Sequence, residues 1–175
     1  MDGIEVLANA PPGVTGIVVL FDYRGPDREL VLGLKHNRGI TAVPALADRL
    51  CAGVRDQAWL PPPAVVTWVP TTPARRRDRG YDQSFLLAKA VARRLGIPCR
   101  RLLQRRGHAQ EGLDAAARRA GPELSARRTV PEPVLVVDDV VTTGATLAAA
   151  ASALRAAGAP AVHAAVLAAA PAPGA

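Results

Sequence analysis

VLVVDDVVTTGATLAAA, residues 134–150, is the stretch of the chain that decides its fold. It opens with four apolar residues of high β propensity, which predict a strand buried on both faces of a parallel sheet. Asp138 and Asp139 follow this run, then a short turn of small polar residues, then a segment rich in alanine and leucine that favours a helix. The expected order is therefore strand, acidic pair, turn and helix N-terminus.

The turn and the helix start together predict a site for an anion. Backbone N–H groups in the first turn of a helix lack partners and lie at the positive end of the helix dipole, so they favour phosphate. Gly144 lets the backbone approach a ligand closely, and the threonine hydroxyls of the turn add donors. The adjacent carboxylates Asp138 and Asp139 instead suit the two hydroxyls of a ribose, or a hydrated Mg²⁺. A ribose 5-phosphate satisfies both halves of this pattern.

The alternative is purely structural, with the acidic residues and threonines acting only as a helix cap. One cap needs one such residue, whereas this stretch offers two aspartates and three threonines. A Walker-type nucleotide loop is excluded because no lysine follows the glycine turn, and a Rossmann fingerprint is excluded because Gly144 stands alone.

The run VLVVDDVVTTGAT, residues 134–146, resembles the 5-phosphoribosyl-1-pyrophosphate (PRPP) motif of type I phosphoribosyltransferases. The resemblance implies that Asp138 and Asp139 are the catalytic acids that hold the ribose hydroxyls, and that the TTGAT loop wraps the 5′-phosphate. It implies Mg²⁺ that is carried with PRPP, and no metal-binding residues of the protein itself. The residues that it assigns to the substrate are Asp138, Asp139, Val140, Thr142, Thr143, Gly144, Ala145 and Thr146.

A second informative stretch, residues 71–98, places four arginines on a loop and then an amphipathic helix over 83–95, ended by Gly96. Its RDRGYDQ segment, residues 77–83, resembles the signature of the ComF-like branch of this family, although the N-terminal zinc ribbon of many members of that branch is missing here. Arg79 is expected to bind pyrophosphate through bidentate hydrogen bonds, with Gly80 allowing backbone contact. The neighbouring arginines are equally explained as a solvated charge run.

Composition limits the class of protein. A length of 175 residues suits a single domain, and 49% hydrophobic against 3% aromatic residues predicts a core of alanine, valine and leucine. No apolar run has the length of a membrane span and no signal peptide is recognised, so a cytoplasmic location is expected. Cys51 and Cys99 form no zinc signature, and no disulfide is expected. The net charge of +7 favours polyanions, either nucleic acid or a diphosphate substrate.

The remaining segments predict further elements along the chain. After a frayed start over 1–13, a hairpin is expected from strands over 14–23 and 29–34, and part of 105–128 is expected to be mobile. The other expected elements are helices over 41–54, 110–120 and 147–157, strands over 64–69, 100–104 and 161–167, and a polar link over 121–129.

Together these features predict an α/β fold, with a mostly parallel twisted sheet and helices on both faces, as in type I phosphoribosyltransferases. Residues 1–60 are expected to form a small N-terminal hood with the hairpin, and residues 64–168 the PRPP-binding core of a single domain, 1–175. The expected function is transfer of the phosphoribosyl group of Mg-PRPP to a nitrogenous acceptor, with release of pyrophosphate. The alternative is a non-catalytic protein that senses PRPP or takes part in DNA uptake. The acceptor, a homodimer and nucleic-acid binding stay open, and no membrane partner is expected.

Overall fold

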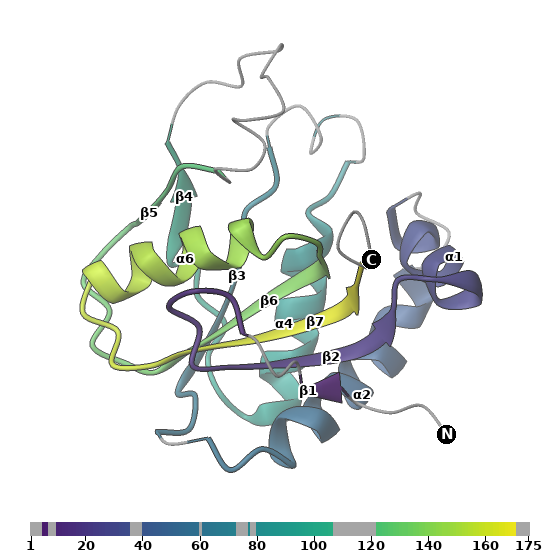
Figure 1. Cartoon of the computed structure of the whole chain (residues 1–175), viewed down its shortest axis with the longest axis horizontal. Helices are drawn as coiled ribbons and strands as arrows, with labels where there is room; N and C mark the ends of the chain where they lie inside the picture. The colour runs from purple at the N-terminus through teal and green to yellow at the C-terminus, as the bar shows by residue number, and fades with distance from the viewer. Residues whose placement is uncertain are drawn as a thin grey trace.

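The computed structural model describes residues 5–6, 10–35, 40–59, 61–72, 77, 80–106 and 122–170. Its main sheet has five strands in the order β1-β2-β7-β6-β3, in which β1 pairs antiparallel with β2 and all other pairs are parallel (Figure 1). The strands of this sheet are β1 (Glu5–Val6), β2 (Gly16–Asp22), β3 (Val65–Trp68), β6 (Val134–Val141) and β7 (Val162–Ala169). A second, antiparallel sheet pairs β4 (Leu103–Arg105) with β5 (Leu124–Ala126). The helices are α1 (Gly25–Lys35), α2 (Val43–Arg55), α4 (Gln83–Leu95) and α6 (Ala145–Ala156), with a 3₁₀ turn at Ile40–Ala42.

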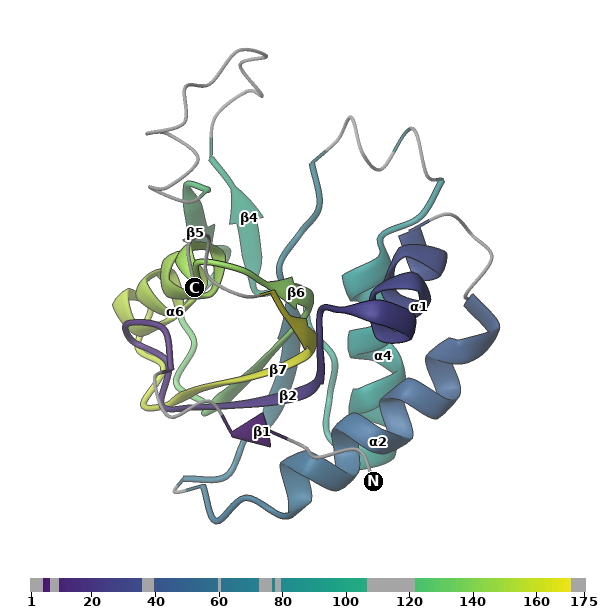
Figure 2. The same cartoon turned by 45° about the vertical axis from the view of Figure 1, so that its right-hand side comes forward.

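The sheet is covered on both faces, as Figure 2 shows, with α2 and α4 on one side and α6 on the other. Because side chains alternate along a strand, each central strand supplies both layers of the core. On β6, Leu135 and Val137 pack with the α2–α4 layer, whereas Val134 and Val136 pack with the α6 layer. All four are at most 1% exposed, so the predicted strand buried on both faces is confirmed.

The connections after β3 and β6 leave the sheet in opposite directions. From β3 the chain passes to α4 on one face, and from β6 it passes to α6 on the other (Figure 1). The two strands are hydrogen-bonded neighbours, so their carboxyl ends flank a crevice at a topological switch point, where open α/β sheets bind ligands.

The two helices beside this crevice, α4 and α6, were both predicted from the sequence. The predicted helix over 83–95 is confirmed: Asp82 caps it by accepting a hydrogen bond from the Phe85 amide, and Gly96 ends it with φ 71°. The predicted helix over 147–157 is also present, although α6 begins two residues earlier and ends at Ala156. The expected helix over 41–54 corresponds to the 3₁₀ turn and α2.

The predicted N-terminal hairpin is wrong, because residues 25–35 form the helix α1 rather than a second strand. Pro26 and Asp27 stand in the first turn, where proline and an acidic residue both favour a helix. Both edges of β2 are already occupied, by β1 on one side and by β7 on the other, so a hairpin partner has no edge to join. Of the segment 1–60 that was expected to form a hood, β2 lies in the main sheet and α2 covers one of its faces.

Two smaller expectations change as well. Residues 121–129 are not only a polar link, because β5 lies within them and pairs with β4 from Leu103↔Ala126 to Arg105↔Leu124. Three residues are too few for a visible alternation pattern, so this strand depends on its partner. The start of the chain is not frayed at β1. The expected helix over 110–120 and the central part of the expected mobile segment lie outside the described residues.

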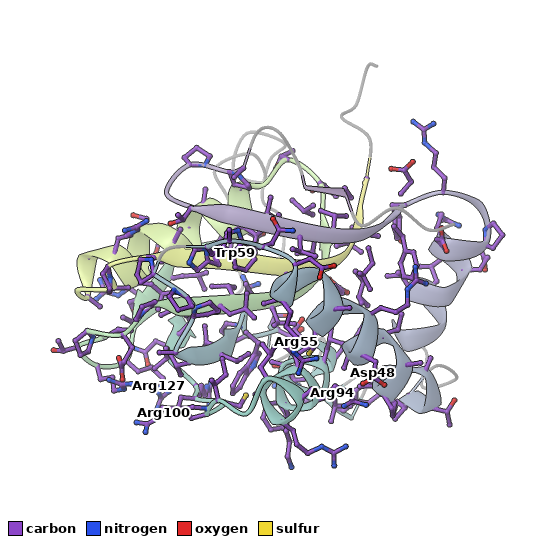
Figure 3. All side chains as sticks on the ribbon, turned by 90° about the horizontal axis from the view of Figure 1, so that it is seen from below. Asp48, Arg55, Trp59, Arg94, Arg100 and Arg127 are labelled. Atoms are coloured by element: carbon purple, nitrogen blue, oxygen red, sulfur yellow. The ribbon has the colours of Figure 1, made fainter. Side chains whose placement is uncertain are left out.

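α4 is fixed to α2 at the end away from the crevice (Figure 3). Arg94 on α4 makes an ion pair with Asp48 on α2, and Arg55 donates a hydrogen bond to the backbone oxygen of Arg94. The hydrogen bond from Arg94 lowers the pKa of Asp48. Asp48 and Arg55 are exposed, so these contacts add little to stability, but with the Arg94 side chain only 16% exposed they define how α4 lies against α2.

Gly16 is required by the packing at the amino edge of the sheet. The ring of Trp59, labelled in Figure 3, stacks on that of buried His163, with ring centres 4.4 Å apart. The same ring lies against Gly16. A Cβ at Gly16 would lie 2.9 Å from Cε2 of Trp59 and closer still to its Nε1. Burial lowers the pKa of His163 and so keeps its ring neutral.

We therefore expect Gly16→Ala to displace Trp59 and to lower the free energy of unfolding by about 1–3 kcal/mol, as overpacking does. Thermal melts and tryptophan fluorescence measure the two effects. Gly33→Ala is the matched control, because nothing lies within 4 Å of a Cβ at that position in α1. Equal melting temperatures for the two variants would contradict this account of Gly16.

Candidate functional site

A cavity of about 410 Å³ opens at the carboxyl ends of β3 and β6. It is lined by the residues that follow β3, the first turn of α4, the end of β6 and the start of α6. The lining residues are Tyr23, Val69, Pro70, Thr71, Tyr81, Asp82, Gln83, Ser84, Arg105, Asp138, Asp139, Val140, Thr142 and Thr146. The cavity therefore occupies the crevice at the switch point of the sheet.

The acidic pair lies inside β6 rather than after it. The strand was expected to end at residue 137, but it continues to Val141 because β7 pairs with it at Asp138↔Val166 and Val140↔Ala168. Asp138 is 9% exposed, and Asp139 is half-buried. The pairing with β7 thus fixes the backbone of both carboxylates in a regular strand.

The first turn of α4 holds both carboxylates. Ser84 Oγ donates a hydrogen bond to Asp138 Oδ1 at 3.0 Å, and Gln83 Nε2 donates to Asp139 Oδ2 at 3.3 Å. Backbone amides complete the arrangement, since Asp139 N–H bonds Asp138 Oδ1 at 2.9 Å and Val140 N–H bonds Asp139 Oδ1 at 2.8 Å. The acidic pair is therefore bound to α4 and is not a helix cap.

Asp82 joins the start of α4 to the end of β3. Its Oδ2 accepts hydrogen bonds from Trp68 Nε1 at 3.2 Å and from the Thr71 amide at 3.3 Å, while its Oδ1 accepts from the Phe85 amide at 3.2 Å. The helix start that carries Gln83 and Ser84 is thereby attached to the sheet on two sides.

Asp138 is a buried carboxylate with a second carboxylate beside it. Burial and the neighbouring charge of Asp139 raise the pKa of Asp138 to about 7, against the hydrogen bonds from the Asp139 amide and Ser84 and the positive charge of Arg105. A carboxylate that is buried beside a second carboxylate is suited to bind hydroxyl donors or a cation. The two aspartates therefore fit a ribose diol, and they fit Mg²⁺, which prefers carboxylate oxygens.

The phosphate loop leads from β6 into α6. Gly144 precedes the helix with φ 76°, and a Cβ there would lie 2.9 Å from Cγ of Pro11, so the position requires glycine. Gly144 has no side chain to cap α6, and the Ala148 amide donates to the Gly144 oxygen at 2.9 Å, while the Ala145 amide makes a long hydrogen bond of 3.4 Å to Thr143 Oγ1. The start of α6 thus presents backbone amides and a threonine hydroxyl together, the donors that suit an anion.

The predicted site residues are only partly brought together. Five of them line the cavity: Asp138, Asp139, Val140, Thr142 and Thr146. Thr143, Gly144 and Ala145 instead line a neighbouring cavity of about 710 Å³, together with Pro12, Gly13 and the outer side of α6. Gly80 has φ 75° and is exposed, with open space around a Cβ. Arg79 lies outside the described residues.

Sequence reasoning missed several residues of the cavity. Ser84 was not singled out, and Gln83 was noted only as part of a motif. Arg105 reaches the cavity from β4, and its Nε donates to the Pro70 oxygen at 2.8 Å. Tyr23 reaches it from the end of β2. The sequence signal for Ser84 is its place at a helix start behind a strand end, where ligand sites form, and Gln83 shares this signal in addition to its motif.

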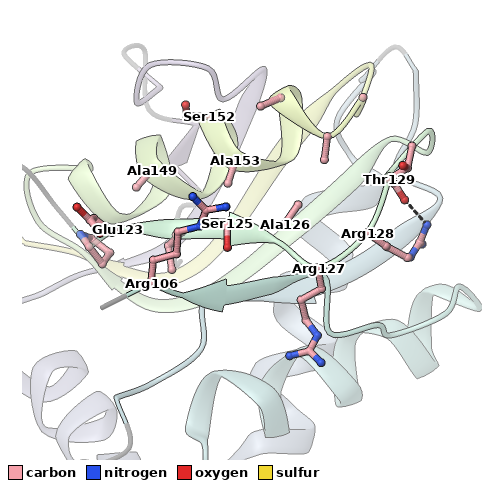
Figure 4. Close-up of a pocket in the computed structure, with 15 residues that line it drawn as sticks. Arg106, Glu123, Ser125, Ala126, Arg127, Arg128, Thr129, Ala149, Ser152 and Ala153 are labelled. Atoms are coloured by element: carbon pink, nitrogen blue, oxygen red, sulfur yellow. Dashed lines mark hydrogen bonds between the residues drawn. The ribbon is translucent and has the colours of Figure 1, made fainter. Parts of the chain in front are cut away.

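A larger cavity, about 920 Å³, lies elsewhere, between α6 and the β4–β5 sheet (Figure 4). Its walls are mainly small residues of α6, with Arg106, Arg127 and Arg128 around them, and Glu123 is the one acidic residue among those that line it. It holds no pair of carboxylates, and it opens on the outer side of α6. We therefore place the candidate active site in the smaller cavity.

Comparison with known proteins identifies the family of the chain. Residues 82–174 match the family model of the phosphoribosyl transferase domain, and the chain belongs to this family. This range contains α4, the acidic pair and the phosphate loop. The predicted fold class, a mostly parallel sheet with helices on both faces, is thereby confirmed. No curated protein matches the chain.

Similar solved structures include a glutamine PRPP amidotransferase from B. subtilis complexed with ADP and GMP, with 27% identity and a TM-score of 0.53 over 78% of this chain. An allosteric regulatory enzyme of purine biosynthesis gives 25% identity and a TM-score of 0.52, also over 78% of this chain. The chain spans 30% of the length of each. The adenine phosphoribosyltransferase of Leishmania tarentolae is 17% identical, with a TM-score of 0.48, over 91% of this chain and 78% of the enzyme.

Within the part of the chain that the structure describes, no helix combines the length and apolar character needed to cross a bilayer.

Proposed function

We propose that the chain binds PRPP as its Mg²⁺ complex and transfers the phosphoribosyl group to a nitrogenous acceptor, with release of pyrophosphate. The observation that carries this proposal is the meeting of Asp138 and Asp139 with the start of α6 at one cavity. A ligand with a ribose diol at one end and a phosphate at the other fits this combination. The 27% identity to a protein named as a PRPP amidotransferase supports the same substrate.

In this reaction the protein chiefly positions and shelters the substrate. Asp138 and Asp139 hold the ribose hydroxyls, and the amides and hydroxyls of residues 142–146 hold the 5′-phosphate. The C1–O bond breaks with both electrons leaving on pyrophosphate, the acceptor nitrogen forms the new C1–N bond, and its proton passes to the pyrophosphate or to water. The transition state resembles an oxocarbenium ion, so fixed geometry and nearby carboxylates favour it, and no protein nucleophile is needed.

Mg²⁺ enters this proposal as part of the substrate, where it neutralises charge on the pyrophosphate. The cavity offers it the carboxylates of Asp138 and Asp139, whose oxygens are of the kind that Mg²⁺ prefers. Arg79 and Gly80 are proposed to contact the pyrophosphate, on the ground of their motif and their place after the end of β3.

The test is pyrophosphate release from PRPP with a panel of purine, pyrimidine and amine acceptors. Release that depends on one acceptor and is lost in Asp139→Asn is the expected result. The free energy of unfolding of the same variant should fall by no more than about 0.5–1.5 kcal/mol, since asparagine can still accept the bond from the Val140 amide while its bond with Gln83 changes. No PRPP binding by the folded wild type would refute the proposal.

A second candidate is a binding protein that keeps the PRPP site without turnover, as the resemblance to the ComF-like branch allows. The observation that favours it is the group of exposed arginines around the β4–β5 sheet, Arg100, Arg101, Arg106, Arg127 and Arg128. PRPP binding without pyrophosphate release for any acceptor, together with DNA binding that falls steeply between two salt concentrations, would favour this candidate over the enzyme.

Arg79→Ala gives a separate test of the pyrophosphate contact. We expect it to weaken PRPP binding at least tenfold while ribose 5-phosphate binding is kept, because only PRPP carries the pyrophosphate and a charge-assisted contact contributes about 1.5–3 kcal/mol. Calorimetric titration with both ligands measures the difference. Equal losses for the two ligands would assign Arg79 to general electrostatics instead.

A further inference from the structure

A tight turn before β2 lies beside α6, as Figures 1 and 2 both show. It consists of Pro11, Pro12, Gly13 and Val14, and the Val14 amide closes it by donating to the Pro11 oxygen at 3.0 Å. Proline at the second position and a glycine of positive φ at the third, here 79°, are typical of a type II turn. Because the two prolines fix φ and the hydrogen bond closes the turn, it has little conformational freedom of its own.

The turn is fixed in place at its far end, away from the phosphate loop. The Thr15 amide donates to the Val162 oxygen at 2.7 Å, at the start of β7. Arg155, in the last turn of α6, donates to Thr15 Oγ1 at 2.8 Å and makes a longer bond of 3.4 Å to the Gly13 oxygen. Both β7 and α6 therefore hold the turn against the molecule.

Pro11 is the residue of this turn that meets the phosphate loop. Apart from the chain neighbours of Gly144, the three heavy atoms nearest to a Cβ at that glycine all belong to Pro11, with Cγ at 2.9 Å and Cβ at 3.1 Å. The half-buried ring thus occupies the side of Gly144 on which any other residue would carry its side chain. The loop cannot move toward the turn without a collision with this ring.

We infer that Pro11 is a positioning residue, which holds Gly144 and the phosphate loop in the conformation that binds the 5′-phosphate. This inference rests on the proposed function. Glycine is the most flexible residue, and the loop amides bind a phosphate together only when the loop has one conformation. A rigid ring against Gly144 lowers the entropy that the loop loses on binding. Pro11 lines neither of the two cavities beside the loop, so it acts through Gly144 and not on the ligand itself.

The experiment titrates ribose 5-phosphate calorimetrically into wild type, Pro11→Gly, Pro11→Ala and Pro11→Val. Glycine removes the whole ring, alanine keeps Cβ, and valine restores a Cγ beside the loop. We expect the affinity to fall about 3–10-fold in Pro11→Gly, to fall less in Pro11→Ala and to be largely restored in Pro11→Val. Pro12→Gly is the matched control, because it loosens the same turn but leaves the Pro11 ring. It should cost stability through the unfolded chain and keep the wild-type affinity.

An effect through Gly144 also predicts coupling between the two positions. In wild type Gly144→Ala introduces both a clash with the Pro11 ring and an unfavourable φ, whereas in Pro11→Gly only the φ remains unfavourable. The affinity lost through Gly144→Ala should therefore be at least about threefold smaller in the Pro11→Gly background. A merely structural role of Pro11 would give additive losses.

Additive losses overturn the inference, and so do equal affinities of Pro11→Gly and Pro12→Gly. Thermal melts of the same samples ensure that each affinity refers to folded protein. If Pro11→Gly does not fold, Pro11→Ala takes its place in both comparisons, since it removes the nearer atom, Cγ. Wild type that binds no ribose 5-phosphate would instead refute the proposed function, which keeps the two failures distinct.

Discussion

Asp138→Asn is expected to make the protein more stable at alkaline pH while it weakens the binding of PRPP. Asparagine has the same shape, and its Oδ1 can still accept the hydrogen bonds from Ser84 Oγ and the Asp139 amide. What the substitution removes is a buried negative charge beside a second carboxylate. The cost of that charge is visible in the pKa of Asp138, which is raised to about 7.

The direction of the pH dependence follows from this shift. The folded protein holds the proton of Asp138 up to about pH 7, whereas the unfolded chain releases it near the ordinary value of 3.8. Between these values the folded state binds more protons, so wild type loses stability as pH rises, and the loss is complete above about pH 7. A shift of this size corresponds to on the order of 2–4 kcal/mol, or about 5–10 °C in melting temperature for a chain of this length.

Thermal melts of wild type and Asp138→Asn at pH 5 and pH 8 measure the effect. The difference between the two proteins should be larger at pH 8, and it should level off at higher pH. Asp48→Asn is a useful comparison, because the pKa of Asp48 is lowered rather than raised and its variant should not gain stability with pH. A variant that is less stable than wild type at pH 8 would show that Asp138 serves the fold and not the ligand.

Gly144→Ala is expected to reduce the affinity for ribose 5-phosphate by a factor of about ten to one hundred. The new Cβ meets Pro11 at 2.9 Å and the φ of 76° disfavours any side chain, so the loop must shift. A phosphate held by several amides at a helix start loses them together when the loop moves. Binding titrations and melts of the same samples separate the loss of affinity from the loss of stability.

Gly96→Ala is the matched control for this variant. Gly96 has φ 71° at the end of α4, and nothing lies within 4 Å of a Cβ there. It shares the conformational penalty of Gly144 but not the contact with Pro11, and it lies away from the cavity. Ribose 5-phosphate binding that falls equally in both variants would remove the phosphate loop from the proposed site.

Local signals in the sequence were sufficient for the elements that carry the site. The apolar run before the acidic pair predicted β6, and the glycine turn with the alanine-rich segment predicted α6. The helix α4 begins after Asp82 and ends before Gly96, as predicted, because capping is a local property. The cavity itself agrees with the general position of ligand sites in open α/β sheets.

The errors arose where structure depends on distant partners. Residues 29–34 are rich in leucine and valine, which suits a strand, yet β2 already has β1 and β7 as neighbours, and no local pattern reveals this. The strand β6 continues through two aspartates because β7 supplies the ladder beside them. Ser84 entered the site for the same reason, since its contact with Asp138 joins residues 54 positions apart in the chain.

The position of β7 has a consequence for how the protein is made. β7 lies between β2 and β6, so the ribosome completes both of its neighbours before the strand that joins them. At about 5–20 residues per second, the interval from the end of β6 to the end of β7 lasts on the order of a few seconds. During that interval β2 and β6, both rich in valine, have an unpaired edge that faces the missing strand, and such edges are where nascent chains aggregate or recruit chaperones. Chaperone dependence during synthesis is therefore expected to end when residues 162–169 leave the exit tunnel.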